Sequence, residues 1–271
     1  NRYHFPVVVV LYLSLVGVVL AGNDEQRKTV IVTATRTAQT ADEILSSVTV
    51  ISREDIERRQ ARSVEDLLRG TQGISIANSG GPGKNTSVFI RGTESDHVLV
   101  LIDGVRAGSA TSGGAAYGNI PIEQIERIEI VRGPRSSLYG SEAIGGVIQI
   151  FTRKGGKEGF TPSFSIGGGS YGTFNGSAGL SGRSKRGWFN MNISGKSTNG
   201  FNSCTGKPFP NGAGCYTNEP DRDGYQNVAG SFRAGYLFKN GLDIETNFMQ
   251  SSGKNNYDGT FANKSELVQR V

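Results

Sequence analysis

The sequence predicts an α+β domain followed by the first antiparallel strands, about five, of a transmembrane β-barrel. Three observations support this: an apolar N-terminal leader, a middle region that mixes capped helices with short β-branched runs, and a C-terminal region in which apolar and polar residues alternate. The composition agrees, because 39 glycines in 271 residues without a G-X-Y period suit many turns and strands rather than collagen or a helical bundle.

Residues 1–22 have the features of a secretory signal peptide. Arg2 and His4 precede the apolar run 7–20, and Ala21 completes a cleavage pattern of small or modest residues. No later stretch approaches the roughly 20 consecutive apolar residues that a membrane helix needs. We therefore expect an exported chain that enters a membrane only as a barrel.

The net charge of +5 does not by itself indicate a nucleic-acid partner. The 29 basic residues are dispersed among 24 acidic ones, without a Lys/Arg block that could follow phosphates. His97 stands alone, and the sequence has neither a Gly-x-Ser-x-Gly elbow nor a His/Glu metal motif. We expect no nucleic-acid binding and no enzyme activity.

The middle region, 41–155, is predicted to form one compact domain. Ser52 and Ser63 are each followed three residues later by an aspartate, a capping pattern that predicts helices over 52–60 and from 63 to 70. Short β-rich runs follow, and the continuously apolar run 98–102 is expected to be buried on both faces of a sheet. The predicted strands are 48–51, 74–76, 88–90, 98–102, 125–131 and 147–151.

From residue 156 onward the hydrophobic period becomes two. A short Asn-Gly turn joins two alternating runs, whereas the connection 200–224 is long and polar, and this asymmetry is typical of an outer-membrane barrel. A water-soluble sandwich would alternate in the same way, but the leader and the strand length favour the barrel. The alternating runs are 189–193, 232–238 and 242–248.

About five strands cannot close around a domain of this size, since barrels with a plugged lumen have about 22 strands. An open sheet edge in lipid would also leave backbone groups without hydrogen bonds. We therefore expect this sequence to be the N-terminal fragment of a longer protein.

Two segments have both a functional and a plainer structural interpretation. Residues 29–34 are short and β-branched, and suit either recognition by strand addition or an ordinary first strand. The loop 80–86 fails as a phosphate-binding P-loop, because Asn78 stands where the first glycine belongs and Asn85 follows the lysine. It is either a loop presented to a ligand or a plain turn.

Acidic and cysteine residues in the C-terminal loops also have alternative interpretations. Asp221, Asp223 and Asp258 lie in turns, where they could bind calcium or simply bond their own backbone. Cys204 and Cys215 bracket a turn-rich segment. In an oxidising compartment we favour a disulfide, worth roughly 3 kcal/mol by the loop-entropy argument, over a metal pair, since no histidine lies nearby.

Taken together, several segments resemble the TonB-dependent outer-membrane receptors. Residues 29–34 (TVIVTA) resemble a TonB box, and four further segments resemble the plug domain of this superfamily. These are 88–92 (VFIRG), 98–104 (VLVLIDG), 125–134 (IERIEIVRGP) and 138–150 (LYGSEAIGGVIQI). The resemblance is dense over 28–155 and looser beyond, and it implies a plug followed by the start of a 22-stranded barrel.

Within this superfamily the segments 78–92, 97–106 and 132–136 are most similar to the cobalamin transporter family. The resemblance implies active transport of cobalamin across the bacterial outer membrane, contact with outer-membrane lipid, and TonB-driven remodelling of the plug. It implies no covalent cofactor, with calcium as a possible ligand of the outer loops. Asn202 and Ser252 stand where that family has two further carboxylates, which weakens the calcium prediction.

The resemblance assigns residues and boundaries as follows. The TonB box is Thr29, Val30, Ile31, Val32, Thr33 and Ala34; the substrate contacts are Lys84, Asn85, Thr86, Ser87, Ser109 and Ser112; and the calcium ligands are Asp221, Asp223 and Asp258. The predicted divisions are a signal peptide (1–22), the TonB-box segment and linker (23–40), the plug (41–155) and the first part of the barrel (156–271). The competing hypotheses are a siderophore or other metal-chelate receptor of the same fold, and a surface β-protein without transport.

Overall fold

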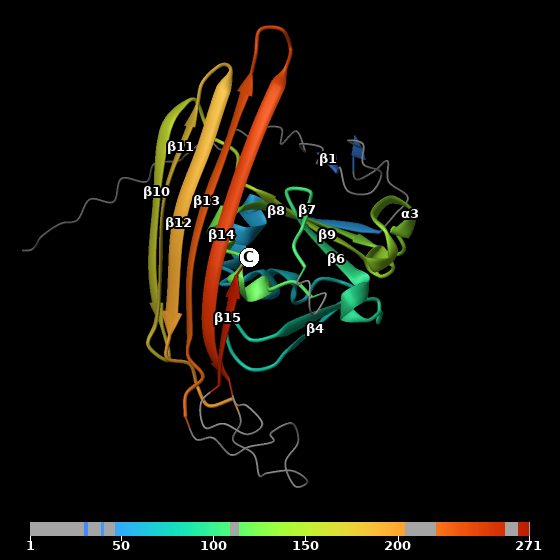
Figure 1. Cartoon of the computed structure of the whole chain (residues 1–271), viewed down its shortest axis with the longest axis vertical. Coiled ribbons are helices and arrows are strands. Elements are labelled where there is room, and N and C mark those ends of the chain that lie inside the picture. The colour runs from blue at the N-terminus through green and yellow to red at the C-terminus, as the bar shows by residue number, and fades with distance from the viewer. Residues whose placement is uncertain are drawn as a thin grey trace, which may run out of the picture.

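The computed structural model describes residues 30–31, 39–40, 47–108, 114–203, 221–257 and 265–270. It consists of a mixed α/β domain and a six-stranded antiparallel sheet, and the domain lies against one face of that sheet (Figure 1). We call the sheet the wall. The signal peptide, most of the TonB box, Ser109, Ser112, both cysteines and Asp258 lie outside the described residues.

A five-stranded mixed sheet is the frame of the domain. Its order is β3-β8-β9-β6-β7, in which β6 runs parallel to β9 and the other neighbours are antiparallel. Every residue of β6 is buried, as its continuous apolar run predicted. The strands are β3 (Val48–Ile51), β6 (Val98–Ile102), β7 (Val105–Arg106), β8 (Ile125–Arg132) and β9 (Gly146–Thr152).

Both predicted helix starts are confirmed. Helix α1 (Arg53–Arg59) begins after Ser52, whose hydroxyl accepts a hydrogen bond from the Asp55 backbone while the Asp55 carboxylate accepts one from the Ser52 backbone. Helix α2 (Val64–Leu68) begins after Ser63 and is shorter than predicted, because the chain is already extended at Arg69. No helix in the described part of the chain is long and apolar enough to cross a membrane.

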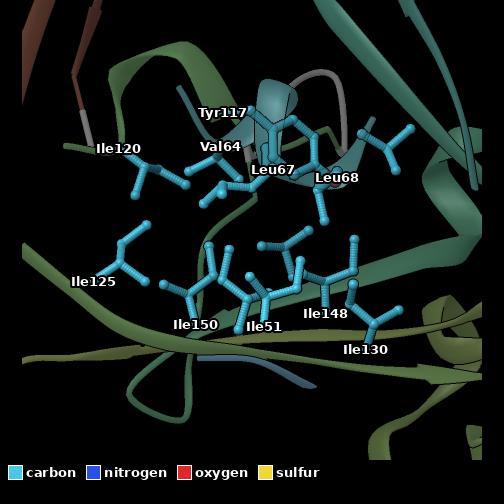
Figure 2. Close-up of a cluster of buried hydrophobic side chains, with 14 of the residues drawn as sticks. Ile51, Val64, Leu67, Leu68, Tyr117, Ile120, Ile125, Ile130, Ile148 and Ile150 are labelled. Atoms are coloured by element: carbon cyan, nitrogen blue, oxygen red, sulfur yellow. The ribbon is translucent and has the colours of Figure 1, made fainter. Parts of the chain in front are cut away.

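The hydrophobic core of the domain lies between α2 and the sheet. Figure 2 shows side chains of α2 and of the 117–120 segment facing side chains of the sheet strands. A smaller cluster of Leu99, Leu101, Ala143 and Val147 lies on the opposite face. The labelled core residues are Ile51, Val64, Leu67, Leu68, Tyr117, Ile120, Ile125, Ile130, Ile148 and Ile150.

A separate hairpin projects from the domain. Strands β4 (Ile74–Asn78) and β5 (Thr86–Ile90) pair antiparallel, so residues 79–85 form the tip of the hairpin. The remaining short elements are β1 (Val30–Ile31), which pairs with β2 (Gln39–Thr40), together with η2 (Ser95–His97), η3 (Tyr117–Asn119), η4 (Ile122–Gln124), α3 (Ser136–Tyr139) and η5 (Ser141–Ala143).

The wall contains six strands rather than the predicted five or so. The first two strands were not recognised as separate runs because glycine and serine interrupt their alternation. The predicted run 242–248 ended too early, because the outward side chains of β14 become polar beyond 248 while the strand continues to Tyr257. Each strand pairs antiparallel with the next. The strands are β10 (Gly159–Gly169), β11 (Thr173–Arg183), β12 (Gly187–Thr198), β13 (Tyr225–Leu237), β14 (Asp243–Tyr257) and β15 (Ser265–Arg270).

The register places the large apolar side chains on the face of the wall that points away from the domain. Met191, Phe232 and Phe248 are aligned across three strands, and Phe160 and Phe164 are each 77% exposed. The inward face carries mainly small and polar residues, and its large side chains, such as Tyr225 and Met249, contact the domain. This arrangement is the reverse of a water-soluble sandwich and is the pattern of a lipid-facing barrel wall. The exposed apolar residues include Ile166, Phe174, Ile193, Val228, Tyr236 and Ile244.

Candidate functional site

The tip of the β4–β5 hairpin is held in shape by short-range hydrogen bonds. Asn78 accepts from the Gly80 backbone through Oδ1 and donates through Nδ2 to Thr86 Oγ1 at 2.8 Å. The Ser79 backbone donates to the Asn85 carbonyl at 3.0 Å. These bonds give the loop 79–85 one defined conformation. The sequence alone did not decide whether this loop is presented to a ligand or is a plain turn.

The tip makes close contact with the wall at Gly83. This glycine has φ +74°, and a Cβ at its position would overlap the ring of Tyr225 on β13. Its carbonyl accepts a hydrogen bond from Asn255 Nδ2 of β14 at 2.7 Å. Glycine is therefore required twice here, for the left-handed backbone and for the close approach of the two parts.

Lys84, which was predicted to contact substrate, lies in an ion pair between the tip and the wall. Its Nζ is 3.1 Å from Asp223 Oδ1, and the two side chains are only 3% and 2% exposed. The other carboxylate oxygen accepts a hydrogen bond from the Ser203 backbone at 2.8 Å. The structure thus brings together one predicted substrate residue and one predicted calcium ligand.

The other predicted substrate residues lie in different environments. Asn85 is exposed, Ser87 is partly exposed, and Thr86 is buried. The Thr86 hydroxyl lies 3.3 Å from Oε1 of the buried Glu65. Asn85 is therefore the predicted side chain of the tip that solvent reaches most freely.

A second contact between domain and wall involves η3. The Tyr225 hydroxyl lies 2.8 Å from both the Gly118 carbonyl and Asn119 Oδ1, and Asn227 and Gln269 also approach the Asn119 amide. Asn119 is 1% exposed, so its amide depends on these partners. Nothing in the sequence singled out these residues, because their partners are more than 100 positions away.

The pKa of Tyr117 in the same region is raised, first by burial and then by the nearby Glu65 carboxylate. The phenol therefore stays protonated at any physiological pH. It packs with the hydrophobic core and has no role as an acid or a base.

A third contact lies towards the other end of β13, where Arg233 points inward. Its guanidinium donates to Asp103 Oδ1 at 2.7 Å, to the Thr152 carbonyl at 2.8 Å and to Glu245 Oε1 at 2.6 Å. Lys154 pairs with the other oxygen of Glu245 at 2.7 Å. Asp103 and Thr152 belong to the domain, so this network connects the C-terminal ends of β6 and β9 to β13 and β14.

Arg132, within a segment that resembles a plug, acts inside the domain. It donates to the Gln72 carbonyl at 2.7 Å, and to Ser47 and Thr49 on the opposite side. Burial lowers its pKa, and the neighbouring Arg91 lowers it further. Arg132 therefore fastens the start of β3 to the rest of the domain.

A cavity of about 470 Å³ separates the domain from the first strands of the wall. Arg53, Glu57 and Arg62 line it from the domain, and Ser165 and Asn175 line it from the wall. Most direct bonds between the two parts therefore lie along β13 and β14. Along β10–β12 they are fewer: Lys196 donates to the Arg62 carbonyl at 3.4 Å, and Arg183 donates to the Gly155 carbonyl where the domain joins the wall.

These residues hold the domain against the wall through buried hydrogen bonds and ion pairs. Within the described ranges, no three His, Cys, Asp or Glu side chains form a group that could hold a metal ion. Asp221 is partly exposed, and Asp223 is directed towards Lys84. The calcium site and the disulfide remain predictions, since Asp258 and both cysteines lie outside those ranges.

Comparison with known proteins decides the family. Residues 40–147 match the TonB-dependent Receptor Plug Domain. Residues 40–147 belong to the plug-domain family of the TonB-dependent receptors. The domain against the wall is therefore the plug, and the wall is the beginning of the outer-membrane barrel. The relatives of the receptor are transporters and receptors, not enzymes.

The receptor is 39% identical over 215 residues to the vitamin B12 transporter BtuB of Vibrio cholerae, covering 79% of this chain and 34% of the relative. It is 38% identical over 221 residues to BtuB of Photobacterium profundum, with the same coverage of both chains. The chain thus spans about a third of the length of these curated relatives.

Solved structures show the same fold. The siderophore receptor PirA of Acinetobacter baumannii superimposes with a TM-score of 0.59 at 24% identity, covering 78% of this chain and 32% of its own. The pyoverdine receptor FpvA of Pseudomonas aeruginosa gives a TM-score of 0.67 at 16% identity, covering 86% and 31%.

Proposed function

We propose that the receptor imports cobalamin across the outer membrane in a TonB-dependent reaction. The observation that carries this proposal is the 39% identity to a vitamin B12 transporter over 79% of the chain. The siderophore receptors share the fold at lower identity, which supports outer-membrane transport in general but not their substrates.

The geometry supports an orientation in the membrane. The long connection between β12 and β13 follows Thr198, whereas short turns join β11 to β12 and β13 to β14 at the opposite end. Long loops face outwards in outer-membrane barrels. The hairpin tip, which meets the wall beside Tyr225, then lies on the outer side, where Asn85 can contact substrate.

The mechanism needs no chemistry on the substrate. Substrate binds to the plug loops and outer loops, and TonB engages the box at 29–34 from the periplasm by adding a strand to it. A pull on the box remodels the plug, and the Arg233–Asp103 and Lys84–Asp223 ion pairs then separate as the plug moves from the wall.

Direct binding to the intact receptor in outer-membrane vesicles tests the substrate. We expect saturable binding of cyanocobalamin and no comparable binding of ferric siderophores. Preferential binding of a ferric siderophore would replace cobalamin by a metal chelate on the same fold. Absence of TonB-dependent uptake of any small ligand would favour a surface β-protein that does not transport.

A further inference from the structure

We propose that Lys84 takes the place of a bound cation beside Asp223, so that the hairpin tip and the outer end of the wall are joined without a metal ion. Lys84 and Asp223 are then positioning residues for the outer surface of the plug. The proposal concerns how this surface is ordered and does not depend on which substrate the receptor carries.

The carboxylate of Asp223 already has a partner on each oxygen. Oδ1 lies 3.1 Å from Lys84 Nζ, and Oδ2 accepts from the Ser203 backbone at 2.8 Å. The Asp223 backbone is itself fixed, because its N–H donates to the Phe201 carbonyl at 3.1 Å. Residues 201 and 203, at the start of the long connection, therefore hold Asp223, at its end, with its carboxylate directed towards the plug.

Burial makes the pairing obligatory. With side-chain exposures of 3% and 2%, neither charge is solvated by bulk water, and each is tolerated only because the other is present. Removing one partner would leave an uncompensated charge in the contact between plug and wall. A surface ion pair of the same length would have no such consequence.

The ammonium group also disfavours a calcium ion at Asp223. Calcium takes about six to eight oxygen ligands, and a divalent ion on this carboxylate would face the positive charge of Lys84. Asp221, two residues away, is partly exposed rather than directed into the same buried site. The side chain of Lys84 supplies the positive charge that an acidic outer loop would otherwise take from a metal.

The surrounding contacts show what the ion pair positions. A Cβ at Gly80 would lie 2.9 Å from Ser203 Oγ, and a Cβ at Gly81 would lie 3.4 Å from the ring of Phe201. The tip and the start of the long connection therefore fit closely around the pair. Any displacement of the plug must draw the ammonium away from the carboxylate, so plug movement releases this part of the outer loop.

Hydrogen exchange on the intact receptor, without substrate, tests the proposal. The readout is the exchange rate of the backbone amides of Ser203 and Asp223, compared in excess chelator and in millimolar calcium. The variants are Lys84→Met, Asp223→Asn and the double variant, with Lys185→Met, in an exposed turn at the other end of the wall, as control.

We expect equal wild-type rates with and without calcium. Each single variant should exchange at least about tenfold faster at these amides, and the double variant should recover most of the protection, because it leaves no unpaired charge. The control should match the wild type. Calcium-dependent protection of the wild type, or effects of the single variants that simply add in the double variant, would overturn the proposal. Because no substrate is present, a failure to bind cobalamin would not affect the result.

Discussion

At the scale of single residues, Gly83 sets how closely the hairpin tip approaches the wall. We expect Gly83→Ala to destabilise the tip by about 1–3 kcal/mol, because the new methyl would overlap the Tyr225 ring at a backbone position with φ +74°. Faster hydrogen exchange of the Ser79 and Lys84 amides, which both bond within the tip, would report the loss.

Gly92 provides the matched control for this substitution. It has φ +77°, but nothing lies within 4 Å of a Cβ at its position. Gly92→Ala should therefore strain its own turn without affecting exchange at the tip. If both variants accelerated exchange at Ser79 equally, the overlap with Tyr225 could not be the cause.

The role of Lys84 illustrates what sequence patterns omit at this scale. The resemblance to the cobalamin transporter family assigned Lys84 to substrate contact, and the tip does present Asn85 to solvent. The carboxylate that pairs with Lys84 is 139 positions away, beyond any local periodicity. Only the packing of the plug against the wall reveals that the side chain is buried.

At the scale of elements, α1 depends on its capping box. We expect Ser52→Ala to weaken the helix by about 1 kcal/mol, since the backbone N–H of Asp55 loses its acceptor. The measurement is hydrogen exchange of the Ile56 and Glu57 amides in the intact receptor, with Ser75→Ala, at an exposed position of β4, as the control. Unchanged exchange would mean that packing of Ile56 alone holds the helix.

The same box gives a sign for the pH dependence. The pKa of Asp55 is lowered from its ordinary value of 3.8, first by the hydrogen bond from the Ser52 backbone and against the opposing effect of burial. A depressed pKa in the folded state stabilises the helix above the unfolded-state pKa, and this contribution is lost as the pH falls through the folded value. The cap should therefore persist at neutral pH and weaken only in acid.

The TonB box is a second element with a specific expectation, which rests on the sequence alone. We expect Val32→Pro to abolish uptake while leaving substrate binding intact, because proline removes a backbone donor that strand addition requires. Val32→Ala keeps that donor and should transport normally. Normal uptake by the proline variant would remove the assignment of the box to 29–34.

Elements whose signals are local were predicted well, and those that depend on their surroundings were not. The patterns that predict the two helix caps and the buried strand β6 each lie within a few adjacent residues. Strands β10 and β11 escaped separate recognition because Gly167, Gly176 and Gly179 supply no side chain to the alternation. Their identity as strands comes from pairing with their neighbours rather than from their own pattern.

At the scale of the whole molecule, Arg233 is the main ionic link between the plug and the wall near the short turn that joins β13 to β14. We expect Arg233→Met to destabilise this contact by about 3 kcal/mol, because the buried Asp103 carboxylate loses its charged partner. Exchange of the Asp103 and Thr152 amides should accelerate. Arg186→Met, in an exposed turn, is the control, and equal effects of both variants would exclude a specific link.

The change of hydrophobic period near residue 156 indicated where the alternating strands begin, and the first strand of the wall, β10, starts at Gly159. How the two parts fit together could not be predicted. Asn119, Tyr225 and Arg233 lie in segments whose patterns indicate only a turn and two positions on a strand. Their function arises because the inward face of β13 happens to meet the plug, which is a property of the assembled molecule.

The cavity between α1 and the first strands of the wall has a consequence for how the plug would travel. Along β13 and β14, direct hydrogen bonds such as Arg233–Asp103 and Asn255–Gly83 must break before the plug can move. Along β10–β12, apart from the Lys196–Arg62 and Arg183–Gly155 hydrogen bonds, polar groups face a space of about 470 Å³ that is large enough to hold water. Fewer bonds must break on that side, so we expect the plug to rotate about its contacts with β13 and β14 rather than to slide evenly along the barrel axis.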